Sequence, residues 1–366
     1  MNKIAVFFTL FLCCSCVLCG AQAYEIVWLG DMHYDSPDLH TKEYVERQEQ
    51  SSKNRLRRNL YSWVDSGLSN LVLEKASKAA QNTPFAFEIG DFAHGFAGSQ
   101  AQATTMYTDA ISRISGLFTV PFYFCPGNHE YRGIGAKTLD KTLLPYLKQK
   151  LNPSVKLKGY NFVLTHENDL FVFWDSIKPD LSWLKHTLNE HSAARYIFII
   201  THYPVLPVFR GKFDRISLNK EHVEWIPFAK ESQSSERRSL LNLLSSHNVI
   251  VLCGHIHEQT LLEYADPQGK ITQISAYSLF EPDAPALNGP LHEGDVKLYE
   301  EKMSVQKILS KGGAMAELLN DYIPHLTRYA YLKGAGYCVL HIDDGGITNE
   351  FRSIKAGDTP QISIIR

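Results

Sequence analysis

Short apolar runs that end abruptly in polar residues dominate the hydrophobic pattern of this chain. They occupy residues 26–29, 85–89, 121–125, 196–200 and 249–253. Near-continuous hydrophobic runs of this length are typical of strands in a sheet that is covered on both faces. Helical patterns lie between them, at 68–81, 104–114, 180–190 and 236–246. The alternation of strand and helix predicts an α/β sheet.

The polar residues that follow these runs are rich in aspartate and histidine. In chain order they are Gly30-Asp31-Met32-His33, Gly90-Asp91, Gly127-Asn128-His129-Glu130, Thr201-His202 and Gly254-His255-Ile256-His257. Ligands of open α/β sheets collect outside the carboxyl ends of the strands. Because every cluster directly follows a predicted strand, we expect the clusters to meet at one edge of the sheet.

A set of these side chains forms the candidate metal ligands. The set is Asp31, His33, Asp91, Asn128, His202, His255 and His257. Carboxylate, imidazole and amide-oxygen donors suit manganese, iron, cobalt or zinc, and the lack of a thiolate in the set argues against a soft-metal site. Each motif alone is weak, because an isolated Asp-x-His pair is more often structural. Together, in a workable order and all at strand ends, they predict a metal centre.

As an ordered series, these motifs resemble the calcineurin-like metallophosphoesterase superfamily. The resemblance extends from about residue 26 to residue 257, and an apolar run at 337–342 is similar to the closing strand of that family. The resemblance implies an α/β fold, built as a four-layer α/β/β/α sandwich with two mixed sheets. It also implies two divalent or trivalent metal ions (manganese, iron, zinc or cobalt) at the strand ends.

The resemblance assigns a role to each candidate ligand. Asp31, His33 and His257 match the ligands of the first metal, Asn128, His202 and His255 match those of the second, and Asp91 matches the bridging carboxylate. A metal pair about 3.5–4 Å apart lowers the pKa of a shared water and clamps phosphoryl oxygens. The implied reaction is attack of the resulting hydroxide on phosphorus, in line with the leaving group.

Other residues of the motifs are expected to act on the substrate or beside it. His129 matches the family histidine that contacts the phosphate and protonates the departing alkoxide. Asn128 is expected to contact the substrate as well as a metal, and Glu130 to orient His129 through its other ring nitrogen. His94 has two interpretations. It is either a pocket residue that touches the phosphate or leaving group, or a partly buried loop histidine with a backbone partner.

Departures from named subfamilies bear on the substrate. His94 stands where purple acid phosphatases carry a tyrosine, so a ferric-tyrosinate site is not expected. Tyr34 stands where Ser/Thr protein phosphatases need glycine, which argues against protein phosphatase activity. The acid sphingomyelinase-like branch shares an early Asp-x-His-Tyr-like motif and a histidine soon after Gly-Asp. The likeness to that branch is loose, because His94 lies one position closer than its pattern requires.

Three functions fit these residues. The first is a phosphomonoesterase for small extracellular phosphates, such as nucleotides or sugar phosphates. The second is a phosphodiesterase for lipid head groups, cyclic nucleotides or other diesters, and the third is a metal-binding module without turnover. Room for a second ester substituent depends on residues 34–63 and 285–330. The latter is interpreted as a helical insertion over the site, within one domain that covers residues 24–366.

Residues 1–23 have the pattern of an export signal. Lys3 precedes an apolar run at 4–18, and Ala21-Gln22-Ala23 matches the small-x-small cleavage pattern. We therefore predict a secreted or periplasmic protein without a stable membrane anchor. A membrane-spanning anchor and a lipid anchor through Cys19 are the alternatives.

Charge and cysteine content argue against other classes. The formal net charge of −2 gives no reason to expect nucleic-acid binding, which usually needs a basic surface. After the predicted signal, the cysteines are Cys125, Cys253 and Cys338, and each lies in an apolar run. We expect them to be small core residues, not a disulfide framework. The expected partner is a small phosphate ester.

Overall fold

The part of the chain described by the computed structural model is residues 22–43, 46, 63–64, 66–208, 226–279, 290–332, 334–354 and 361–364. The predicted signal lies outside this part except for residues 22 and 23. Most of the segment 34–63 and the first residues of the predicted insertion, 285–289, lie outside it too. Among the described helices, none combines the length and the apolar character that crossing a membrane would need.

The described residues form two sheets, and the first carries the three N-terminal motifs. Its strand order is β14-β13-β12-β1-β2-β3. The strands are β1 (Tyr24–Leu29), β2 (Ala86–Glu88), β3 (Phe122–Phe124), β12 (Gly336–Asp343), β13 (Gly346–Ser353) and β14 (Gln361–Ile364). β1, β2 and β3 are parallel, and β12 runs antiparallel to β1 with Cys338 opposite Trp28. β12 is therefore the returning strand predicted at 337–342.

The second sheet carries the two remaining motifs. Its strand order is β10-β11-β8-β9-β7-β6-β5-β4. The strands are β4 (Phe162–His166), β5 (Asp169–Phe173), β6 (Ile197–Ile200), β7 (Ile250–Cys253), β8 (Gln259–Asp266), β9 (Gly269–Ser275), β10 (His292–Gly294) and β11 (Leu326–Leu332). β5, β6, β7 and β9 pair in parallel, whereas the flanking pairs are antiparallel. Both sheets are mixed, as predicted.

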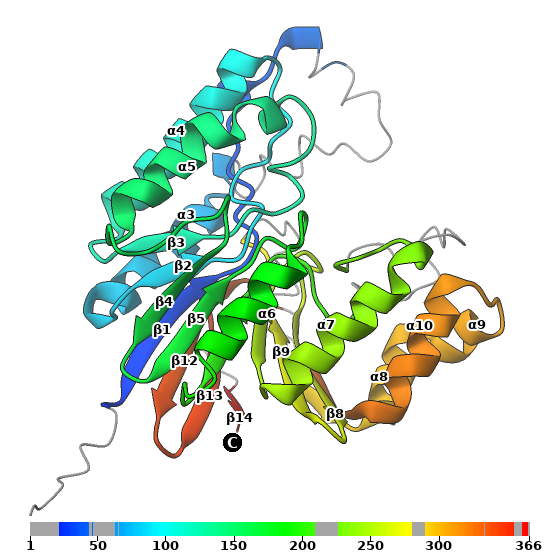
Figure 1. The fold of residues 1–366 in the computed structure, drawn as a ribbon. Coiled ribbons are helices and arrows are strands. Elements are labelled where there is room, and N and C mark those ends of the chain that lie inside the picture. Colours follow the sequence, from blue (N-terminus) through cyan, green and yellow to red (C-terminus); the bar gives the residue numbers. More distant parts are fainter. Residues whose placement is uncertain are drawn as a thin grey trace, which may run out of the picture.

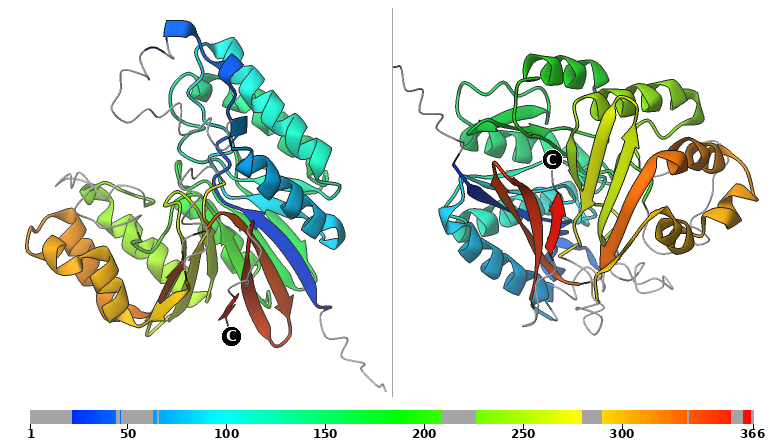
Figure 2. Two further views of the ribbon diagram at one scale, coloured as in Figure 1. Left: turned by 180° about the vertical axis from the view of Figure 1, so that it is seen from behind. Right: turned by 90° about the horizontal axis from the view of Figure 1, so that it is seen from below.

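Helices cover the outer faces of both sheets, and this gives the predicted four layers (Figures 1 and 2). The first sheet is covered by α3 (Leu68–Ala79), α4 (Gln100–Leu117) and α5 (Leu139–Lys150). The second is covered by α6 (Leu181–Glu190), α7 (Ser234–Ser246), α8 (Val296–Met303), α9 (Val305–Leu309) and α10 (Ala314–Tyr322). Short 3-10 turns are η1 (Pro37–Leu39), η3 (Ala80–Asn82), η4 (Gly135–Lys137), η6 (Glu231–Gln233) and η8 (Ile323–His325).

Aromatic side chains fill the space between the two sheets. Phe87 of β2 meets Phe173 of β5 edge to face, with ring centroids 5.7 Å apart. Phe85 meets Phe171 in the same way at 5.1 Å. Such pairs contribute about 0.5–1.5 kcal/mol beyond the area they bury. The predicted core cysteines are all buried, and none of the three is in a disulfide.

The predicted helices are present, and their caps explain where some of them begin. Ser99 caps α4 by accepting a hydrogen bond from the Gln102 N–H at 3.2 Å. Asp180 caps α6 by accepting from the Trp183 N–H at 2.9 Å. Such side chains accept from the otherwise unbonded first amides of a helix. α5 was not predicted, and it contains Pro145, a residue that usually ends a helix.

The predicted insertion at 285–330 contains helices, but those within its described residues, 290–330, do not lie over the site as predicted. α8, α9 and α10 pack against the outer face of the second sheet, beside α7 (Figure 1). There Tyr299 and Leu319 share a buried cluster with Leu262 and Tyr329. The helices bury their apolar faces on β8 and β11 and therefore lie against the sheet. β10 and β11 also extend that sheet.

Candidate metal centre

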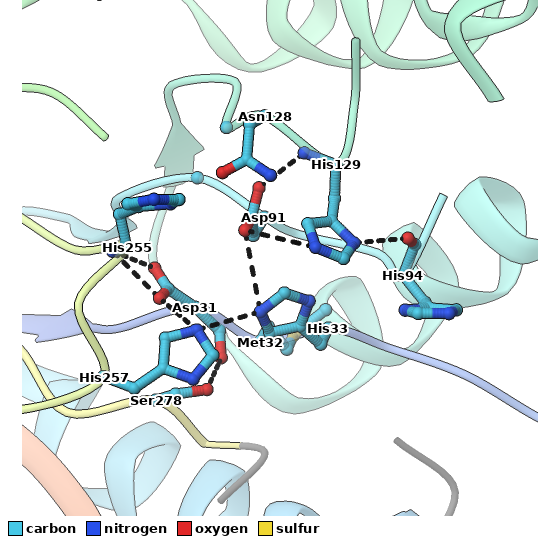
Figure 3. Close-up of polar contacts among 12 residues, drawn as sticks. Asp31, Met32, His33, Asp91, His94, Asn128, His129, His255, His257 and Ser278 are labelled. Carbon is cyan, nitrogen blue, oxygen red and sulfur yellow. Dashed lines mark hydrogen bonds and ion pairs between the residues drawn. The ribbon is translucent and has the colours of Figure 1, made fainter. Parts of the chain in front are cut away.

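The loops that follow β1, β2, β3, β6 and β7 meet at one edge of the two sheets and bring the candidate ligands together (Figure 3). The first sheet contributes Asp31, His33, Asp91 and Asn128, and the second contributes His202, His255 and His257. Parallel strands place their carboxyl ends at the same edge, and the two sheets face each other. The convergence that the motifs predicted is therefore a product of the strand topology.

Asp31, His33 and His257 form the first of two donor groups. One ligand atom from each lies within 4.8 Å of the others. His257 Nε2 is 3.0 Å from Asp31 Oδ2 and 3.3 Å from His33 Nε2. These are the residues that the resemblance assigned to the first metal.

Asp91, His202 and His255 form the second group, with ligand atoms again within 4.8 Å of one another. His202 Nε2 lies 3.2 Å from His255 Nδ1 and 3.0 Å from Asn128 Oδ1. Asn128 therefore joins this group, as the resemblance implied. Asp91 Oδ2 lies 3.4 Å from His202 Nε2 and 3.6 Å from His33 Nε2, so it stands between the two groups.

The donors suit the metals that the sequence predicted. Burial lowers the pKa of His33 and His255 well below the ordinary value, and neighbouring histidines add to the effect. Neutral imidazole is the form that binds a cation. Carboxylate, imidazole and amide oxygens, packed within hydrogen-bonding distance of one another, match a pair of first-row transition ions better than calcium or magnesium.

Charge inside the centre is balanced between Asp91 and its histidine neighbours. Burial raises the pKa of Asp91, but His202 and His129 outweigh that effect and hold it well below the usual range. Burial likewise lowers the pKa of His202, but Asp91 and Asp31 outweigh it and raise that pKa to about 9. Asp91 and His202 thus each favour the charged form of the other.

Backbone strain marks the ligand loops. His33, Asp91, His255 and His257 have φ angles of 46°, 59°, 68° and 51°. Left-handed conformations cost non-glycine residues about 1–3 kcal/mol, and they cluster at functional sites. Gly127 has a complementary role, because a Cβ atom there would lie 2.2 Å from Asp91 Oδ1. The motif glycine is needed for the close approach of this loop to Asp91.

His129 lies at the edge of the centre and is held by two hydrogen bonds. Its ring Nδ1 is 2.6 Å from the His94 carbonyl oxygen, and its backbone N–H donates to Asp91 Oδ1 at 2.7 Å. Its Nε2 lies 3.9 Å from Asp91 Oδ2. The edge of its ring also meets the His33 ring, with centroids 4.5 Å apart.

The expectation that Glu130 orients the ring of His129 is wrong. The other ring nitrogen of His129 contacts the His94 carbonyl instead. Glu130 is fully buried and accepts hydrogen bonds from the backbone N–H groups of Asp91, Gly127 and Ala93, at 2.9, 2.7 and 3.2 Å. Burial and the nearby Asp91 raise the pKa of Glu130 to about 8. Its partners are thus loop amides.

His94 joins the same region. Its side chain is buried, its N–H donates to the Tyr34 carbonyl at 3.0 Å, and its own carbonyl supports His129. One ring nitrogen lies within 4.8 Å of ring nitrogens of His33 and His129. The side chain is therefore more buried than the loop interpretation predicted, and its ring lies beside the centre. Contact with a substrate stays a prediction.

Sequence reasoning missed Glu88. It ends β2, is fully buried, and accepts hydrogen bonds from the Met32 and Gly90 N–H groups at 3.3 and 2.9 Å. A charged residue inside the apolar run 85–89 was the pattern that could have revealed it. A buried carboxylate in such a strand needs hydrogen-bond donors, and here two loop amides supply them.

The fold and the site together define a class of protein. Two groups of nitrogen and oxygen donors, with an aspartate between them, are the arrangement by which hydrolases hold two metal ions. The family model for calcineurin-like phosphoesterases matches residues 24–259, well over half of the chain. The chain belongs to this family, and it is a metal-dependent hydrolase of phosphoric esters.

The solved structures that match the chain share little sequence with it. GAP50, the anchor in the inner membrane complex of Plasmodium, is 14% identical with a TM-score of 0.49, over 94% of this chain and 89% of that one. A dimetal phosphatase from Danio rerio is 11% identical with a TM-score of 0.49, over 93% and 98%. No curated protein matches the chain. The assignment rests on the family match and the site.

Proposed function

We propose that this chain is an exported phosphomonoesterase that acts on small phosphate esters outside the cytoplasm. The observation that carries the proposal is the pair of donor groups with Asp91 standing between them and His129 beside them. Asp31, His33 and His257 would hold one cation, and Asn128, His202 and His255 the other. When bound, two such cations supply a water of lowered pKa and neutralise phosphoryl oxygens.

The hydrogen bonds of His129 support its proposed role as general acid. A carbonyl oxygen can only accept, so the contact with the His94 carbonyl places a hydrogen on Nδ1. Nε2 is therefore the nitrogen that faces the centre, where it lies near Asp91. A protonated Nε2 can donate to the departing alkoxide oxygen, and a neutral one can accept from a substrate hydroxyl.

A nearby positive charge favours a monoester over a diester. Arg132 is exposed and lies in the turn after His129. Its backbone N–H donates to the His129 carbonyl oxygen. Burial is the main cause that lowers the pKa of His129 and His255, and the charge of Arg132 adds to it in both. A phosphate monoester carries up to two negative charges, and a diester carries one. Positive charge beside the centre stabilises the monoester more.

The position of the His94 ring supports the proposal that it contacts the phosphate. We expect His94→Ala to raise KM for a small phosphate ester, with metal content unchanged, because the ring lies beside His33 and His129 and outside the two donor groups that would hold the cations. Steady-state kinetics with metal analysis of the same sample measures both. An unchanged KM would leave His94 as a loop residue that only supports His129.

Paired substrates separate the competing functions. The purified chain is given Mn²⁺, Zn²⁺ or Co²⁺ and assayed with nitrophenyl phosphate beside bis-nitrophenyl phosphate. We expect higher kcat/KM on the monoester. Higher kcat/KM on the diester would favour the phosphodiesterase, and inactivity on both with every metal would favour a binding module. Export is tested separately: protein recovered from the medium or periplasm should begin at Tyr24.

A further inference from the structure

Glu88 links two of the ligand loops. Its Oε1 accepts from the Met32 N–H at 3.3 Å and its Oε2 from the Gly90 N–H at 2.9 Å. Met32 lies between Asp31 and His33 in the loop after β1, as Figure 3 shows, and Gly90 directly precedes Asp91 in the loop after β2. One carboxylate thus fixes the spacing between the first donor group and the aspartate that stands between the groups.

Glu130 makes the corresponding link one loop further along. It accepts from the Asp91 N–H and the Gly127 N–H, which belong to the loops after β2 and β3. The two carboxylates therefore brace three consecutive loops of the first sheet. The Glu88 carboxylate accepts from the loops after β1 and β2, whereas its backbone carbonyl accepts from the Cys125 N–H at 3.4 Å, directly after β3.

Two buried carboxyl groups at this edge of the sheet are unfavourable for the stability of the fold. Glu88 and Glu130 are both fully buried, and within the described ranges neither forms an ion pair with lysine or arginine. Burial and the charge of Glu130 raise the pKa of Glu88 well above its usual value. A buried carboxyl group close to a second one is unfavourable for packing alone, so its presence fits a role in loop geometry better.

We propose that Glu88 is a positioning residue that sets the distance between the loop of Asp31 and His33 and the loop of Asp91. The inference rests on the metal centre proposed above. Glu88→Gln replaces one acceptor oxygen with an NH₂ group, which cannot accept a hydrogen bond, so either the Met32 or the Gly90 N–H loses its partner. The loops can then separate.

The effect should differ between the two metals. We expect Glu88→Gln to weaken the site of Asp31, His33 and His257 by about 10–100-fold, the usual range for groups that support metal ligands. The other site should change by less than about threefold, because Glu130 still joins the loops of Asp91 and Asn128 through the Asp91 and Gly127 N–H groups. Calorimetric titration of the chelator-treated chain with Zn²⁺ gives both dissociation constants. The constant that is lost in His257→Ala identifies the first site.

A buried carboxylate elsewhere is the matched control. Asp169 begins β5, away from the centre, and is 1% exposed. Its carboxylate accepts hydrogen bonds from the Arg195 side chain and the Tyr196 N–H. Asp169→Asn should lower thermal stability and leave both zinc constants unchanged. Equal weakening of both constants by Glu88→Gln, or constants equal to those of the unaltered chain, would overturn the inference. Absence of zinc binding by the unaltered chain would instead overturn the proposed metal centre.

A measurement on the unaltered chain covers the case in which Glu88→Gln does not fold. After metal removal, the Met32 and Gly90 amides should still exchange slowly with deuterium, because the Glu88 carboxylate and not the metal holds them. The amides of the loop that carries His255 and His257 serve as the comparison, because within the described residues no hydrogen bond joins that loop to the Glu88 carboxylate. Rapid exchange of both the Met32 and Gly90 amides without metal would contradict the positioning role.

Discussion

His129 differs from the neighbouring donors because its hydrogen bonds leave one nitrogen for chemistry. We expect His129→Ala to lower kcat by about 10²–10⁴-fold, the range for loss of a general acid, while metal content stays the same. His186→Ala is the matched control, since that ring lies on α6 and is 71% exposed. Kinetics and metal analysis are measured together. Loss of metal from His129→Ala would show that its assigned role is wrong.

Residue positions were predicted better than residue contacts. The motif spacing predicted that Asp31, Asp91 and His255 would meet, because each follows a strand and parallel strand ends share an edge. It did not predict the partners of Glu130 or Glu88. Both carboxyl groups accept from backbone N–H groups. Every residue except proline has such a group, so the sequence does not show which residue donates to a given acceptor.

At the scale of elements, a buried ion pair joins α8 to the residue after His257. Lys302 Nζ lies 3.2 Å from Glu258 Oε1, and the two side chains are 15% and 3% exposed. We expect Lys302→Met to lower the free energy of unfolding by about 3 kcal/mol, because it leaves the Glu258 carboxylate buried without a cation. Urea denaturation measures the change.

A double variant tests whether the pairing is the cause. Lys302→Met with Glu258→Gln removes both charges and should recover more than half of the stability that the single variant loses. If the single variant is as stable as the unaltered chain, the pair does not contribute. If the double variant recovers nothing, the loss comes from the contact between Lys302 and the Tyr331 ring, which lies 4.1 Å from Nζ.

The N-cap of α6 gives a prediction with a pH dependence. Hydrogen bonds from Lys158 and the Trp183 N–H hold the pKa of Asp180 below its ordinary value. The stability that Asp180 contributes is therefore complete above its pKa in the unfolded chain. It is lost as pH falls through its lower pKa in the folded chain. Asp180→Ala should cost about 1 kcal/mol at neutral pH and progressively less in acid. Asp180→Asn, which can still cap, should retain most of the stability. An equal loss in both variants would contradict the capping role.

Strands could be predicted from the sequence where every one of their side chains is buried. β6 and β7 are buried on both faces, so their sequences are unbroken apolar runs. β8 was not predicted, because Gln259, Thr260 and Glu263 interrupt its apolar pattern. Thr260 contacts Ser275 of β9 through its hydroxyl, and Glu263 pairs with Lys270 of β9. Helix α5 was missed because it contains Pro145, and a proline usually ends a helix. Local pattern cannot show what tertiary packing tolerates.

At the scale of the molecule, the centre joins the two sheets. Asp31, His33, Asp91 and Asn128 come from one sheet, and His202, His255 and His257 come from the other. A cation that binds only the folded chain stabilises it by about 2.7 kcal/mol at a concentration 100 times its dissociation constant. We therefore expect Zn²⁺ to raise the melting temperature over that of the chelator-treated chain. Asp91→Asn should show a smaller rise, and no rise in the unaltered chain would contradict metal binding across the sheets.

The existence of a two-metal centre is tested most directly by anomalous X-ray scattering from crystals grown with Zn²⁺ or Mn²⁺. We predict two peaks about 3.5–4 Å apart on either side of the Asp91 carboxylate. One should lie against Asp31, His33 and His257, and the other against Asn128, His202 and His255. A single peak, or metal bound away from these side chains, would contradict the two-metal assignment.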